Sequence, residues 1–82
     1  MATKVLLVDD HKIMRDGIRA ILKLAEEFQV IGEADNGTDA VSLTKRLRPD
    51  VILMDIGLPG LNGIEATSEI LRHDRETKIV IL

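Results

Sequence analysis

The chain has 82 residues, of which 45% are apolar and 30% charged, with a formal net charge of −3 at pH 7 and no cysteine. This length allows one small domain, and the acidic balance argues against nucleic-acid binding by this segment, because phosphate contacts require a basic face. We expect neither a membrane span, nor a secretory leader, nor a thiolate metal site, and we predict a cytoplasmic protein.

The first half of the chain alternates between the apolar period of a strand and that of a helix. Residues 4–8 are a short, branched run that is typical of a strand buried on both faces. From residue 13 to about residue 25 the apolar positions recur at helical spacing, and residues 30–34 predict a weaker strand, shortened by Gly32. We expect the apolar stripe of this helix to belong to the core; it comprises Met14, Ile18, Ile21 and Leu22.

Turn residues mark the next two elements. The pair Asn36-Gly37 opens a second helix over residues 38–47. Pro49 ends that helix, because the residue before a proline is pushed out of the α region. Residues 50–54 are again a short apolar run and predict a third strand.

The last part of the chain predicts a loop, a third helix and a fourth strand. Residues 57–63 hold three glycines and a proline, but their spacing differs from that of a phosphate-binding glycine loop. A helix is predicted over residues 64–73, with Asn62 as its cap and Glu65 in a capping box, and a strand over residues 78–82. This alternation with short connections predicts an α/β fold, a doubly wound parallel sheet with right-handed crossovers.

Three aspartates follow two of the predicted strands. Asp9 and Asp10 come directly after the first strand, and Asp55 comes directly after the third. If these strands are parallel neighbours, the three carboxylates meet at one edge of the sheet, where open α/β sheets bind ligands. Carboxylates about 5 Å apart repel by roughly 3 kcal/mol per pair at an effective dielectric near 20. We therefore predict an acidic pocket for a hard divalent cation.

These residues form a signature. Two segments together resemble the receiver domain of bacterial two-component response regulators: Val8-Asp9-Asp10-His11 and Asp50-Val51-Ile52-Leu53-Met54-Asp55-Ile56-Gly57-Leu58-Pro59-Gly60-Leu61-Asn62-Gly63. The strand-end aspartate, Asp55, lies about 45 residues after the acidic pair. The match is most similar to receivers of the LuxR/NarL/FixJ type and covers residues 1–82 as a single receiver domain. The resemblance implies a flavodoxin-like (CheY-like) fold with the strand order 2-1-3-4.

The resemblance also implies a role for each acidic residue. Asp55 is the phosphoacceptor, whose carboxylate attacks phosphorus without needing a general base. Mg²⁺ is the implied cofactor, with Asp10 a direct ligand, Asp9 a ligand largely through water, and Asp55 and the Gly57 carbonyl completing the protein ligands. The implied phosphodonor is a sensor histidine kinase, and the implied output is a DNA-binding transcription-regulator domain outside this segment.

The sequence departs from the family at its end. Receivers carry a Thr or Ser just after the fourth strand and a Lys after the fifth, and this chain stops at Leu82. We therefore expect a receiver that is incomplete at its C-terminus and impaired in phosphotransfer. The edge of residues 78–82 has no charge after Lys78 to blunt it, which predicts a homodimer or higher self-association through that edge. We expect no DNA contact by this fragment.

Two alternative functions are also open. One is a phosphatase of the haloacid-dehalogenase kind, but its first-strand motif is Asp-x-Asp, whereas Asp9 and Asp10 are adjacent. The other is a non-phosphorylated interaction module, or a folding fragment of a receiver. We interpret the chain as a phosphoacceptor rather than a turnover enzyme. His11 is expected to begin the first helix facing solvent, with a role as ligand or proton shuttle as the alternative.

Overall fold

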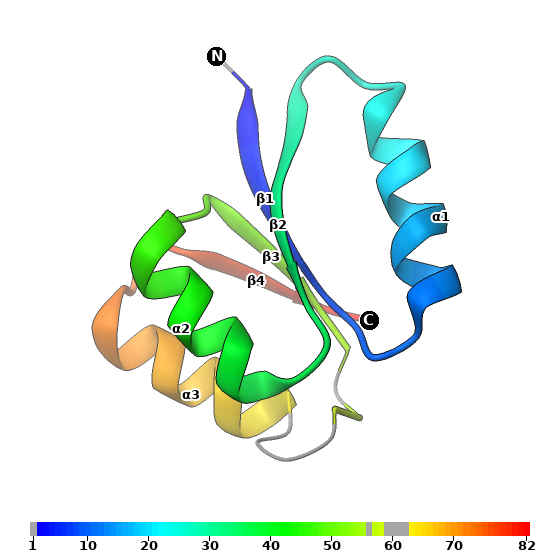
Figure 1. Cartoon of the computed structure of the whole chain (residues 1–82). Coiled ribbons are helices and arrows are strands. Elements are labelled where there is room, and N and C mark those ends of the chain that lie inside the picture. The colour runs from blue at the N-terminus through cyan, green and yellow to red at the C-terminus, as the bar shows by residue number, and fades with distance from the viewer. Residues whose placement is uncertain (1, 56, 59–62) are drawn as a thin grey trace.

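The computed structural model describes residues 2–55, 57–58 and 63–82. Strands and helices alternate along the chain (Figure 1). In chain order they are β1 (Thr3–Val8), α1 (Lys12–Lys23), β2 (Phe28–Ala34), α2 (Gly37–Leu47), β3 (Val51–Met54), α3 (Gly63–His73) and β4 (Lys78–Ile81). The predicted cap Asn62 lies outside the described residues.

The four strands form one parallel sheet in the order β2-β1-β3-β4, which confirms the predicted fold. At the carboxyl end of β1, Val8 pairs with Ala34 on one side and with Met54 on the other. The strands β2, β1 and β3 therefore end level with one another. The residues that follow β1 and β3 are delivered to the same edge of the sheet, as parallel strands require.

The core lies between the sheet and the pair of helices α2 and α3, which lie side by side on one face (Figure 1). Along β3, Ile52 and Met54 are buried while Val51 and Leu53 are only half-buried. Successive strand residues point to opposite faces, so the face toward α2 and α3 is the better covered one. The buried core cluster comprises Leu6, Val8, Ala34, Ala40, Ile52, Met54, Leu58, Ala66 and Ile70.

The expectation that the apolar stripe of the first helix belongs to the core is wrong in part. No residue of α1 is buried, and Met14 and Ile21 are 54% and 68% exposed. Ile18 and Leu22 are half-buried. The helix packs mainly against β2, on the face opposite to α2 and α3 (Figure 1). Within the described residues α1 has no neighbouring helix, so the sheet covers only the side of the stripe that faces it.

The second strand is longer than predicted, because Phe28 and Gln29 also pair with β1, opposite Thr3 and Lys4. The pairing continues through Gly32 to Ala34. The register shifts by one residue between Val5 and Leu6. A Cβ atom at Gly32 would lie 2.9 Å from Cδ1 of Leu47 and 3.3 Å from Cδ1 of Leu6. The glycine therefore lets α2 pack closely on the sheet at this point, rather than ending the strand.

Local hydrogen bonds define both ends of α2. The Asn36 side chain accepts a hydrogen bond from the backbone N–H of Asp39 at 2.8 Å, as an N-cap does. Arg48 ends the helix in the left-handed region with φ of 49°, and its N–H donates to the carbonyl of Thr44. The predicted turn at Asn36-Gly37 is confirmed as the start of this helix.

The strand β4 lies at the edge of the sheet and pairs with β3. Its first residue, Lys78, pairs with Val51 at the end of the sheet remote from Asp55. Val80, Ile81 and Leu82 are all exposed, and Val80 is 46% exposed. None of the helices in the described part of the chain has the length and apolar character needed to cross a membrane.

Candidate functional site

The backbone ladder continues past the strand ends and places the three aspartates. The N–H of Asp55 donates to the carbonyl of Val8 at 2.8 Å, and the N–H of Asp9 donates to the carbonyl of Ala34 at 3.0 Å. Asp9 and Asp55 are thereby held on neighbouring strands by bonds that do not involve their side chains. Asp10 follows in the turn that leads into α1.

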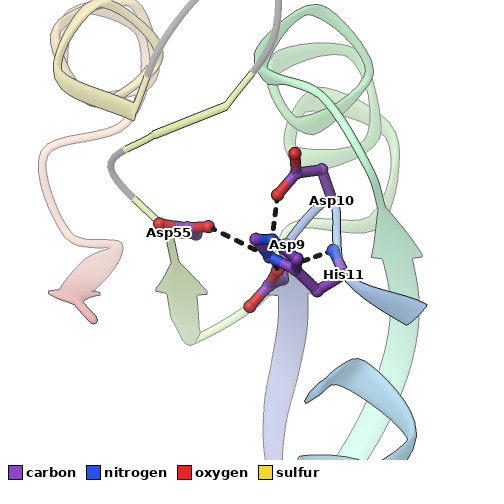
Figure 2. Close-up of side chains that lie close together, drawn as sticks. All are labelled: Asp9, Asp10, His11 and Asp55. Carbon is purple, nitrogen blue, oxygen red and sulfur yellow. Dashed lines mark hydrogen bonds and ion pairs between the residues drawn. The ribbon is translucent and has the colours of Figure 1, made fainter. Parts of the chain in front are cut away.

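The carboxylates of Asp9, Asp10 and Asp55 meet at this edge, together with the imidazole of His11 (Figure 2). One ligand atom from each of the four side chains lies within 4.8 Å of all the others. The Asp9 side chain is buried, whereas the side chains of Asp10 and Asp55 are 33% and 21% exposed. The predicted convergence of the acidic residues is confirmed, and the cluster is open to solvent through Asp10 and Asp55.

His11 also belongs to this cluster, although the sequence interpretation favoured a solvent-facing start of the first helix and kept a role as ligand or proton shuttle as the alternative. It is the N-cap of α1 and its side chain is 71% exposed, as expected for a residue that begins the helix facing solvent. Yet Nδ1 lies 2.9 Å from Oδ1 of Asp9, 3.0 Å from Oδ1 of Asp10 and 3.8 Å from Oδ2 of Asp55. Its position directly after the acidic pair was the available signal.

The carboxylates change the acid–base behaviour of this imidazole. The hydrogen bond to Asp9, followed by the negative charges of Asp10 and Asp9, raises the pKa of His11 above its ordinary value of 6.5. The backbone N–H of His11 also donates to Oδ1 of Asp9 at 2.8 Å. When protonated, the ring places a positive charge among the three carboxylates and offsets part of their mutual repulsion.

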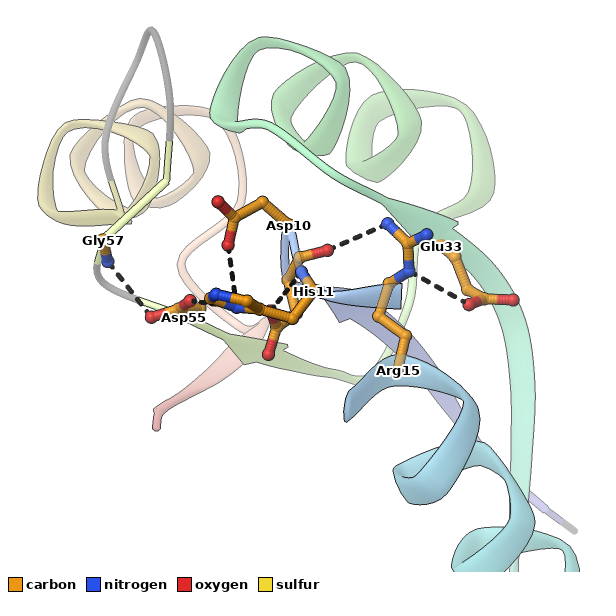
Figure 3. A network of polar contacts seen from close by, with 7 residues as sticks. Asp10, His11, Arg15, Glu33, Asp55 and Gly57 are labelled. Atoms are coloured by element: carbon orange, nitrogen blue, oxygen red, sulfur yellow. Dashed lines mark hydrogen bonds and ion pairs between the residues drawn. The ribbon is translucent and has the colours of Figure 1, made fainter. Parts of the chain in front are cut away.

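Gly57 approaches the cluster from the loop after β3. Its N–H donates to Oδ1 of Asp55 at 3.1 Å (Figure 3). This contact orients the Asp55 carboxylate and places the glycine backbone beside it. The described residues thus bring together the carboxylates of Asp9, Asp10 and Asp55, with the backbone N–H of Gly57 on Asp55.

The donor chemistry of the cluster fits a hard divalent cation. Three carboxylates supply oxygen atoms, and two of them face solvent, so that waters can complete the coordination. Mg²⁺ is commonly bound in this way, by one or two carboxylates with several retained waters, because it dehydrates reluctantly. A cation would also neutralise the charge that the fold concentrates at this edge.

The family follows from comparison with known proteins. The model of the response regulator receiver domain matches residues 5–82. This chain belongs to the response-regulator receiver family. The receiver is 47% identical over 79 residues to the response regulator GacA of Pseudomonas aeruginosa, an alignment that covers 96% of this chain and 37% of GacA. It therefore spans less than half the length of that relative.

Solved structures agree with this assignment. A two-component response regulator of the LuxR family from Aurantimonas superposes on the receiver with a TM-score of 0.93 and 37% identity, covering 99% of this chain and 58% of that one. RcsB from Salmonella enterica, in a structure bound to promoter DNA in the presence of the phosphomimetic BeF₃⁻, superposes with a TM-score of 0.90 and 30% identity. The superposition covers 99% of this chain and 42% of RcsB. The chain therefore has the CheY-like fold of receiver domains, as its signature indicated.

Proposed function

We propose that this receiver accepts a phosphoryl group on Asp55, with Mg²⁺ held by Asp9, Asp10, Asp55 and the carbonyl of Gly57. The observation that carries the proposal is the convergence of three carboxylates, from the ends of two neighbouring parallel strands, to within 4.8 Å. Membership of the receiver family supports it, since phosphoacceptance is what the family resemblance implies.

The transfer needs little from the protein beyond position and charge. A carboxylate oxygen of Asp55 forms a bond to phosphorus while the bond from phosphorus to the donor nitrogen of a phosphohistidine breaks. The electron pair of that bond stays on the imidazole, which takes a proton from solvent. Bound Mg²⁺ supplies charge neutralisation for the phosphoryl oxygens. The Gly57 N–H holds Asp55 in place, and the partial exposure of its side chain leaves it open to the donor.

The partners follow from this chemistry. A sensor histidine kinase is the proposed phosphodonor, which places the receiver in the cytoplasm. DNA contact is assigned to sequence outside these 82 residues, since the net charge of the segment is −3 and phosphate contacts require a basic face. RcsB is solved in complex with promoter DNA, and this chain covers 42% of RcsB, which leaves room for DNA contact by the part that it does not match.

Labelling of Asp55 tests the proposal. The receiver, mixed with acetyl phosphate and Mg²⁺, is expected to gain the mass of one phosphoryl group, slowly because phosphotransfer is expected to be impaired, with the label mapped to Asp55. Asp55→Asn should stay unlabelled, while Asp16→Asn, which removes an exposed aspartate on α1, should label like the wild type. In this proposal the chain is a phosphoacceptor and not a turnover enzyme.

Each alternative gives a different result in the same assay. A folded wild-type chain that stays unlabelled with acetyl phosphate and with BeF₃⁻ would identify a non-phosphorylated interaction module. Steady release of phosphate that depends on Asp9 and not on Asp55 would favour a phosphatase of the haloacid-dehalogenase kind. Either result would overturn phosphoacceptance by Asp55.

We propose in addition that this 82-residue chain self-associates through the edge of residues 78–82. The edge strand β4 exposes Val80, Ile81 and Leu82, and unpaired strand edges of this kind pair with other strands. A two-fold dimer would satisfy both edges without further growth. Light scattering after size exclusion should give twice 9.1 kDa, and Val80→Lys should give a folded monomer. A wild-type monomer at tens of micromolar would contradict the proposal.

A further inference from the structure

A second polar network lies directly behind the acidic turn, on the side of α1 and β2 (Figure 3). Its centre is Arg15 in α1, whose side chain is mostly buried. The Arg15 guanidinium donates from an Nη atom to the backbone carbonyl of Asp9 at 2.9 Å. Its Nε atom lies 3.6 Å from Oε1 of Glu33 on β2. Arg15 thus joins the acidic turn to a strand of the sheet.

The carbonyl of Asp9 belongs to the peptide group that joins Asp9 to Asp10. A hydrogen bond from a charged donor to this carbonyl restricts rotation of that peptide plane. The N–H of Asp9 is already held by the carbonyl of Ala34 at 3.0 Å. With both sides of Asp9 tied to neighbours, the direction in which Asp10 leaves the strand is restricted as well.

Glu33 holds the guanidinium from the opposite side. Its Oε2 atom is 3.0 Å from an Nη atom of Arg19, one helical turn beyond Arg15, so the carboxylate lies between two arginines. Among the described residues the buried Nε of Arg15 has no hydrogen-bond partner. The ion pair with Glu33 is therefore what offsets the burial of this part of the guanidinium, and it keeps Arg15 pointed at the turn.

We propose that Arg15, held by Glu33, is a positioning residue for the divalent-cation site. It sets the peptide between Asp9 and Asp10 so that both carboxylates face Asp55. The inference rests on the proposed function only in that the acidic cluster binds a divalent cation. Neither Arg15 nor Glu33 is among the metal-site residues predicted from the sequence, and in this proposal neither side chain is a metal ligand.

The sign of one measurement separates positioning from simple electrostatics. Removing a positive charge close to the acidic cluster makes the local field more negative, so Coulomb's law alone predicts tighter binding of a divalent cation. Positioning predicts the opposite, because an unheld turn must be ordered again when the cation binds. Residues that orient metal ligands from outside the coordination shell are typically worth about tenfold or more in affinity.

The test measures Mn²⁺ affinity by electron paramagnetic resonance, since Mn²⁺ accepts the same oxygen ligands as Mg²⁺. Arg15→Met keeps an unbranched side chain and removes the donor, and we expect it to weaken Mn²⁺ binding about tenfold. Arg19→Met is the matched control: it removes the same charge and a contact to the same Glu33, but no contact to Asp9. We expect its affinity to equal or exceed that of the wild type.

Two more variants keep the proposal testable if Arg15→Met fails to fold by circular dichroism. Arg15→Lys retains the positive charge but not the planar guanidinium, so we expect it to weaken binding less than Arg15→Met does. Glu33→Gln removes both the hold on Arg15 and a negative charge, so both effects weaken binding and only unchanged or tighter binding in this variant is decisive. Unchanged or tighter Mn²⁺ binding in a folded Arg15→Met variant overturns the positioning role. If Arg15→Met is unfolded, unchanged or tighter binding in both Arg15→Lys and Glu33→Gln overturns it. Failure of the folded wild type to bind Mn²⁺ or Mg²⁺ would instead refute the metal site.

Discussion

Replacing Asp55 by asparagine removes one negative charge from the acidic cluster while keeping an oxygen that can accept the Gly57 N–H. Asp9 and Asp10 are adjacent in folded and unfolded chains alike, but Asp55 meets them only through the pairing of β1 with β3. Its repulsion with them is therefore a cost of the folded state alone. In metal-free buffer we expect Asp55→Asn to be more stable than the wild type.

The size of the effect follows from the geometry. Two unit charges separated by 4.8 Å, the largest spacing in the cluster, repel by about 3.5 kcal/mol at an effective dielectric of 20 and about 0.9 kcal/mol in bulk water. Asp10 and Asp55 are partly exposed, which favours the lower figure. We expect a gain of about 1 kcal/mol at pH 8, and a smaller one at pH 6, where protonated His11 offsets the repulsion.

The assay is urea unfolding in the presence of a chelator, followed by circular dichroism because the chain has no tryptophan or tyrosine. A gain of about 1 kcal/mol corresponds to a rise of roughly 4–8 °C in the melting temperature of a domain this small. Saturating Mg²⁺ should reverse the order, since a ligand at tenfold its Kd adds about 1.4 kcal/mol to the wild type. Glu26→Gln, an exposed site with the same change in charge, is the control.

If Asp55→Asn is no more stable than the wild type in chelator at pH 8, the acidic cluster does not strain the fold as we infer. If Glu26→Gln gives the same gain as Asp55→Asn, the effect belongs to the net charge of −3 and not to the cluster. A melt of the wild type that is insensitive to millimolar Mg²⁺ would count against the cation site itself.

Three further predictions concern individual residues. A pH titration followed by NMR should give His11 a pKa above 6.5, and added Mg²⁺ should lower that pKa. Because the pKa is raised in the folded state, the protonated imidazole contributes its full stability below pH 6.5, and this contribution is lost as the pH rises through the folded pKa. Asn36→Ala should cost about 1 kcal/mol in urea unfolding, since the N–H of Asp39 loses its cap, and Asn36→Asp should restore most of it. Ile52→Ala should cost about 2–5 kcal/mol, because Ile52 is fully buried; a loss below 1 kcal/mol would show that the core collapses around the cavity.

The sequence by itself determined the order of elements and the place of the acidic cluster. Apolar runs with the period of a strand alternate with runs of helical period, and this alternation with short connections leaves a parallel sheet as the simplest fold. Asp9 and Asp55 each follow such a run directly. Since parallel strands deliver their next residues to one edge, the meeting of the carboxylates required no knowledge of side-chain conformation.

Only the tertiary structure decided which neighbours cover the helices and what surrounds the acidic turn. The apolar residues of α1 recur at helical spacing, but this spacing shows only which face is apolar and not what packs against it. The exposure of Met14 and Ile21 could therefore not be predicted from the sequence. The contacts of Arg15 with Asp9 and Glu33 depend on how α1 lies across β2 and on side-chain rotamers. Both are set by packing between segments that are distant in sequence, and no local pattern encodes them.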